Sequence, residues 1–135
     1  MNTYIKENKP DIEVVRNIGM QISKALQYLH EKKIIHQDIK PENILMTKDH
    51  QGVKLVDFGV SNRFEATIID PKIARNGTLR YMSPEQLDGR LSFKSDIWSL
   101  GCLLLQLSTG KKPFFSIKDE LQAALFPCSQ KITPL

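Results

Sequence analysis

Three polar side chains with complementary chemistry lie within six residues of one another. Asp38 carries a carboxylate, Lys40 an ammonium group and Asn43 a carboxamide, in the segment His36-Gln37-Asp38-Ile39-Lys40-Pro41-Glu42-Asn43. A carboxylate can orient a hydroxyl group and accept its proton, a cation can neutralise phosphate charge, and an amide oxygen can bind a hard metal ion. This combination is suited to the transfer of a phosphoryl group.

Short apolar runs on either side indicate that this segment is a loop held at both ends. Residues 34–35 precede it and residues 44–46 follow it, and both runs are typical of short strands. Pro41 argues against a helix through the segment. Fourteen residues after its end, Asp57-Phe58-Gly59 follows the apolar run 53–56 and would supply a second oxygen ligand at the end of a strand. The turn residues before that run predict a hairpin.

In this order and spacing, the two motifs resemble the catalytic loop and the Asp-Phe-Gly motif of the protein kinase family. The resemblance implies that Asp38 is the catalytic base and that Lys40 contacts the transferred phosphate. It also implies that Asn43 and Asp57 hold the Mg²⁺ ions that bridge the phosphates of ATP. Leu45 would form part of the floor under the adenine, although a strand residue of this type can also simply be core. The alternative for the whole pattern is a charged surface loop between two strands.

Residues 57–85 resemble the activation segment of the family, which here ends in Ser83-Pro84-Glu85. Thr78 matches the Thr that touches the catalytic Asp and Lys in kinases acting on Ser or Thr. Together with Lys40, it implies that the partner is a protein substrate with a Ser or Thr hydroxyl group. In the family the Glu equivalent to Glu85 pairs with an Arg on a later helix, and the context of Lys131, the one basic residue after position 120, does not match.

Gln37 is a departure from the family pattern, because most members have Arg at this position. That Arg pairs with a phosphorylated residue of the activation loop. Gln is neutral and cannot form the charge-assisted bidentate contact. We therefore expect that phosphorylation at Thr67 or within residues 68–75 does not strongly activate the kinase.

Two helices are expected to support the loop. Asp11 is a suitable N-cap for a helix of about 20 residues, and its apolar stripe consists of Val15, Ile18, Ile22, Ala25, Leu26 and Leu29. The second helix, at about residues 96–108, is apolar almost all round, so it is expected to be buried on every side. Asp96 resembles the buried Asp of the family that accepts hydrogen bonds from the catalytic-loop backbone. His30 and His36 are expected to be structural.

Composition narrows the class of protein further. The chain has 135 residues, 41% of them hydrophobic and 25% charged, which is typical of one globular domain. The net charge of +4 comes from scattered Lys and Arg residues, so nucleic-acid binding is not expected. No run is long enough to cross a membrane and no signal-like segment is present at the start, which favours an intracellular, cytoplasmic protein. Cys102 is expected to be a buried thiol, and the oligomeric state is not predicted.

The expected fold is α+β, namely the mainly helical C-terminal lobe of the protein kinase fold over residues 1–135, with short β-hairpins around the catalytic loop 36–43. The N-terminal lobe is expected to be absent, because residues 1–33 contain neither a Gly-rich loop nor a strand Lys to clamp ATP. We therefore expect part of a Ser/Thr kinase with negligible activity on its own. The alternatives are a pseudokinase-like interaction or scaffold module, and an incomplete gene model.

Overall fold

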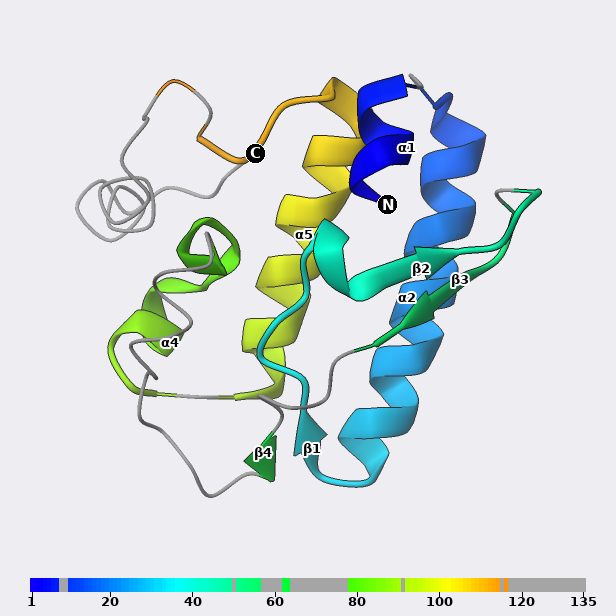
Figure 1. Ribbon diagram of the computed structural model, residues 1–135. Coiled ribbons are helices and arrows are strands. Elements are labelled where there is room, and N and C mark those ends of the chain that lie inside the picture. The colour runs from blue at the N-terminus through cyan, green and yellow to red at the C-terminus, as the bar shows by residue number, and fades with distance from the viewer. Residues whose placement is uncertain are drawn as a thin grey trace.

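The computed structural model describes residues 1–7, 10–49, 51–56, 62–63, 78–90, 92–114 and 116, with only the backbone described at residues 2, 62–63 and 78–79. Two long helices, α2 (Ile12–Glu31) and α5 (Phe93–Thr109), pack against each other and form the body of the structure (Figure 1). The short helix α1 (Asn2–Glu7) contributes Ile5 to their shared core. The described part of the chain is therefore mainly helical, as expected.

Helix α2 has the length and the buried face that the sequence predicts. Asp11 is its N-cap, and the side chain of Asp11 accepts a hydrogen bond from the amide of Val14 at 3.0 Å. Glu13 places a negative charge in the first turn, where it interacts favourably with the helix dipole. The buried face consists of Val15, Ile18, Gly19, Ile22, Leu26 and Leu29, so five of the six predicted residues are buried and Ala25 is only partly buried.

Helix α5 begins earlier than expected and is less completely buried. Ser92 and Ser95 form a capping box before and within the first turn, and Gly110, with φ of 75°, ends the helix in a left-handed conformation. The expectation that α5 is buried on every side is wrong, because the side chain of Ile97 is 53% exposed. The described elements that pack on α5 most extensively are α2 and the 3₁₀ turn η3 (Thr78–Tyr81), and they cover only part of its circumference.

The strands form two small antiparallel sheets. Strand β2 (Ile44–Met46) pairs with β3 (Val53–Leu55), with Ile44 opposite Leu55, which confirms the predicted hairpin. Strand β1 (Ile34–Ile35) pairs with β4 (Asn62–Arg63), which lies in the stretch that resembles the activation segment and for which no strand was predicted. A 3₁₀ turn, η1 (Pro41–Asn43), leads into β2, and the short helix α4 (Pro84–Leu87) follows η3.

Polar side chains of α2 hold the tip of the β2–β3 hairpin. The amide of Gln21 donates a hydrogen bond to the carbonyl oxygen of Gln51 at 2.6 Å and accepts one from the amide of Val53 at 3.0 Å. Asn17 donates a further bond to the same carbonyl oxygen at 3.2 Å. The hairpin is thereby fixed to the same helix that buries its apolar face.

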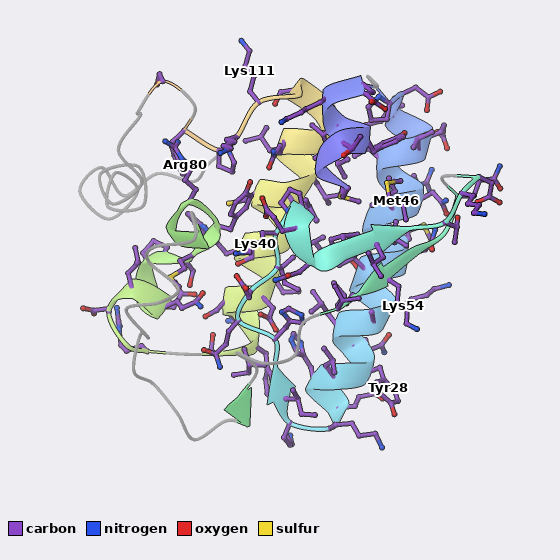
Figure 2. The ribbon with its side chains drawn as sticks, viewed as in Figure 1. Tyr28, Lys40, Met46, Lys54, Arg80 and Lys111 are labelled. Carbon is purple, nitrogen blue, oxygen red and sulfur yellow. The ribbon has the colours of Figure 1, made fainter. Side chains whose placement is uncertain are left out.

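The interior of the described structure is a single apolar cluster between α2, α5 and the β2–β3 sheet. Cys102 lies inside α5 as a free, fully buried thiol, and burial raises its pKa to about 12. Arg80 of η3 is also buried, and its guanidinium group donates to the carbonyl oxygens of Pro113 and Phe114 just after α5 (Figure 2). Among the helices described, none combines the length and the apolar character that crossing a membrane requires.

Candidate active site

The polar segment 36–43 lies between β1 and β2, and the side chains of Asp38, Lys40 and Asn43 are almost completely removed from solvent, whereas Glu42 is exposed. Asp38 is 6% exposed, Lys40 7% and Asn43 4%. Figure 2 shows Lys40 on this segment, between α5 and the start of β2. Charged side chains are rarely buried to this extent unless they are paired, so their partners define the site.

The structure brings Asp38, Lys40 and Asn43 together. The side-chain amide nitrogen of Asn43 donates to Asp38 Oδ2 at 2.9 Å and to the carbonyl oxygen of Asp38 at 2.8 Å. The Nζ atom of Lys40 lies 3.6 Å from Asp38 Oδ1. Because its nitrogen faces Asp38, the amide oxygen of Asn43 is the atom available to a metal ion.

One oxygen of Asp38 is left without a hydrogen bond. Oδ2 is occupied by Asn43, whereas Oδ1 is buried and accepts no hydrogen bond in the described structure. A buried acceptor without a donor is costly, and such atoms concentrate at functional sites. Asp38 Oδ1 is therefore oriented to accept a proton or a hydrogen bond from a bound molecule.

The backbone of the segment is held by a buried carboxylate of α5. Asp96 Oδ2 accepts from the amide of His36 at 2.8 Å, and Asp96 Oδ1 accepts from the amide of Gln37 at 2.9 Å. His30 at the end of α2 places its Nε2 atom 2.9 Å from Asp96 Oδ2. The hydrogen bonds of Asp96 to the loop backbone are those that the resemblance implied, whereas the contact with His30 was not predicted.

His36 uses both of its ring nitrogens to support the backbone. Nδ1 accepts a hydrogen bond from the amide of Asp38 at 3.1 Å, and Nε2 lies 3.0 Å from the carbonyl oxygen of Val56. A carbonyl oxygen can only accept, so Nε2 carries the proton and the ring is in the neutral form with Nδ1 unprotonated. The structural role expected for His36 is confirmed.

The end of strand β3 is fixed to the same segment. The amide of Val56 donates to the carbonyl oxygen of Asn43 at 2.9 Å. Asp57 follows Val56 directly, although Asp57 and its neighbours Phe58 and Gly59 lie outside the described residues. Within the described part of the chain, no group of three or more His, Cys, Asp and Glu side chains is arranged to hold a metal ion.

The remaining predicted residues lie around this centre. Leu45 on β2 is 57% exposed, so it is not a core residue, and its apolar side chain faces solvent beside the loop. Thr78 begins η3, but its side chain is not described. Glu85 lies half-buried in the first turn of α4 and makes no ion pair among the residues that the structure describes. Gln86, which sequence reasoning missed, donates from Nε2 to the carbonyl oxygen of Gln37 at 3.2 Å.

The polar loop 36–43 is thus anchored by a buried Asp of helix α5. The chain belongs to the protein kinase family, since the family model of the protein kinase domain matches residues 1–133. It is similar to the MAP kinase kinase MKK1/SSP32 of Saccharomyces cerevisiae, with 43% identity over 115 residues, which is 84% of this chain and 22% of that protein. It is also 43% identical over 110 residues to human mitogen-activated protein kinase kinase kinase 5, covering 78% of this chain and 8% of that protein.

Similarity extends to bacterial members of the family. Serine/threonine-protein kinase PrkC of Bacillus subtilis is 41% identical over 117 residues, which is 84% of this chain and 18% of that protein. The chain therefore spans less than a quarter of the length of each of these relatives.

Proposed function

We propose that the polypeptide containing this chain is a protein kinase that transfers the γ-phosphoryl group of ATP to a Ser or Thr hydroxyl group of a protein. The observation that carries the proposal is the buried convergence of Asp38, Lys40 and Asn43, in which Asp38 Oδ1 lies beside Lys40 Nζ and accepts no hydrogen bond in the described structure. Asp38 Oδ1 would accept the hydrogen bond of the substrate hydroxyl group and then its proton as the oxygen–phosphorus bond forms. Lys40, beside Asp38, would neutralise charge on the transferred group.

The donor set fits the Mg²⁺ and ATP on which such a reaction depends. The amide oxygen of Asn43 is a hard ligand, and Asp57, two positions after the end of β3 in the sequence, would add a carboxylate. Bound Mg²⁺ would neutralise charge on the phosphates of ATP. The exposed Leu45 would offer an apolar surface to the adenine. Thr78 and Lys40 support Ser or Thr as the acceptor, and Glu85 would help to fix the end of the activation segment.

A second proposal is an interaction or scaffold module without catalysis. In the kinase family a Gly-rich loop before a strand and a strand Lys clamp the phosphates, and the 135 residues of this chain contain neither part. Without those parts, the electrostatic preorganisation around ATP is incomplete, and we expect negligible turnover from this chain alone. The retention of Asp38, Lys40 and Asn43 in a joined, buried arrangement favours the kinase over the scaffold.

The test is phosphoryl transfer by the product of the complete reading frame that encodes this chain. With labelled ATP, Mg²⁺ and a protein substrate, the label should appear on Ser or Thr. Asp38→Asn should lower kcat at least about 100-fold, because it removes the proton acceptor. The matched control is Asp88→Asn, which makes the same chemical change at an exposed carboxylate and should leave the rate unchanged.

Two results would decide between the proposals. Absence of transfer by the unaltered product, or full activity of Asp38→Asn, would contradict the kinase. A rise of the melting temperature with Mg²⁺ and ATP, without transfer, would favour a scaffold that retains a nucleotide site.

A further inference from the structure

The residue before Asp38 is held in an unusual backbone conformation by contacts on both of its peptide groups. Gln37 has φ of 73°, in the left-handed region. Its amide donates to Asp96 Oδ1 at 2.9 Å, and its carbonyl oxygen accepts from Gln86 Nε2 at 3.2 Å. The orientation of Asp38 depends on this residue, because the next peptide unit carries the amide that Asp38 donates to His36 Nδ1.

A non-glycine residue does not adopt this conformation without support. Its Cβ atom approaches the backbone too closely, so the conformation must be stabilised by the surrounding structure. The side-chain amide nitrogen of Gln37 does not supply a hydrogen bond for this, because it is buried without a partner in the described structure. The contacts that remain are those of the backbone, to Asp96 on one side and to Gln86 on the other.

Gln86 reaches Gln37 from a separate element. It lies buried in α4, and the amide of Gln86 donates to the side chain of Ser83, which caps that helix. Helix α4 (Pro84–Leu87) lies at the C-terminal end of the segment 57–85. The Gln86–Gln37 bond therefore joins the end of that segment to the loop that carries Asp38, across 49 positions of the sequence.

We propose that Gln86 is a positioning residue that holds Gln37 in the left-handed conformation and so orients Asp38. Both hydrogen-bonding groups are uncharged, so this contact joins α4 to the catalytic loop without requiring a phosphate group. Its importance for catalysis rests on the proposed kinase function, whereas the contact itself can be tested on the chain without any activity. Asp96 fixes the amide of Gln37, and Gln86 fixes its carbonyl group.

The first test is amide hydrogen exchange, measured by NMR on the 135-residue chain. Gln86→Leu removes the donor while keeping an apolar side chain of similar size. Exchange at the amides of Gln37 and Asp38 should become about tenfold faster, relative to the amide of Ile22 in α2, which reports the stability of the whole structure. The matched control is Gln106→Leu, which removes another buried amide, one that accepts from the hydroxyl group of Tyr81. Gln106→Leu should not produce this local difference.

A rescue experiment separates positioning from packing. Glycine adopts positive φ without the steric cost, so Gln37→Gly combined with Gln86→Leu should restore most of the lost protection at Asp38. A cavity or a clash at position 86 would not be repaired by glycine at position 37. No recovery in the double variant, or a uniform loss of protection in Gln86→Leu, would overturn the proposal. If Gln86→Leu does not fold, Gln86→Met gives the same comparison with a more adaptable side chain.

The second test uses the product of the complete reading frame. Gln86→Leu should lower kcat about tenfold with little change in the KM for ATP, and Gln37→Gly should recover part of the loss. A rise of about tenfold in the KM for ATP, without a change in kcat, would contradict a role of Gln86 in orienting Asp38. If the unaltered product transfers no phosphate, the proposed kinase function fails, and the exchange measurements alone decide whether Gln86 holds the loop.

Discussion

Replacing Asp96 with alanine should be among the most damaging single changes in this structure. The carboxylate is 1% exposed and faces three donors, namely the amides of His36 and Gln37 and the Nε2 atom of His30. The His30 side chain is 17% exposed and can turn to water, whereas the two amides stay buried. A hydrogen bond to a charged group contributes about 1.5–3 kcal/mol, so the loss of two should lower the free energy of unfolding by about 4 kcal/mol.

The isosteric variant makes this estimate sharper. Asp96→Asn keeps one oxygen for one of the two amides and places an NH₂ group against the other. Only one buried amide then lacks an acceptor, so the expected loss is about 2 kcal/mol, roughly half that of Asp96→Ala.

Urea unfolding of the 135-residue chain, followed by the fluorescence of Trp98, measures both values. Asp88→Ala is the control, because Asp88 and its partner Arg90 are both exposed, and it should change stability by no more than about 0.5 kcal/mol. If Asp96→Ala shifted the unfolding midpoint no more than Asp88→Ala does, the carboxylate would not be what holds the loop.

Three further outcomes are expected. Gln21→Leu should destabilise the chain by about 2 kcal/mol, since it removes two bonds to the hairpin, and Asn17→Ala, which removes one exposed bond, should cost less than half as much in the same urea assay. Burial raises the pKa of Cys102 from 9.0 to about 12, so iodoacetamide should spare the peptide containing Cys102 in the native chain at pH 9 and modify it after unfolding, as mass spectrometry can show. The folded state holds the thiol proton of Cys102 more tightly than the unfolded state does. The stabilising contribution of Cys102 is therefore complete below pH 9 and falls as the pH rises towards 12. Alkylation of Cys102 in the native chain as fast as in the unfolded chain would refute the raised pKa. Finally, Gln37→Arg should make the kinase activity of the complete product respond to phosphorylation at Thr67 or within residues 68–75, whereas the unaltered product should respond weakly; strong activation of the unaltered product, lost in Gln37→Ala, would argue against this.

Features encoded by neighbouring residues were predictable. The N-cap at Asp11 starts helix α2, whose apolar residues recur at intervals of three or four positions. The β2–β3 hairpin follows from two short runs that each begin with a β-branched residue and have turn residues between them. The convergence of Asp38, Lys40 and Asn43 was predictable for the same reason, since a short loop that contains Pro41 restricts the positions that these side chains can occupy.

Features that depend on distant partners were not predictable. Strand β4 consists of two polar residues that become a strand only by pairing with β1, and no local pattern marks them. Gln86 follows the Ser-Pro-Glu motif, but nothing near it in the sequence indicates that its amide reaches Gln37. The exposure of Ile97 was missed because an apolar sequence shows that a helix can be buried on every side, not that neighbours cover every side.

The bonds of Asp96 also determine when the loop can acquire its shape. They join residues that are 60 and 59 positions apart, so the amides of His36 and Gln37 cannot donate to Asp96 until α5 has been synthesised and has docked against α2. Long-range contacts of this kind form late in folding, because a large loop of chain must close first. A nascent chain that ends before α5 would contain the loop residues 36–43, but without the conformation that Asp96 gives them. The loop 36–43 can therefore reach its final arrangement only after the helical body of the structure has been assembled.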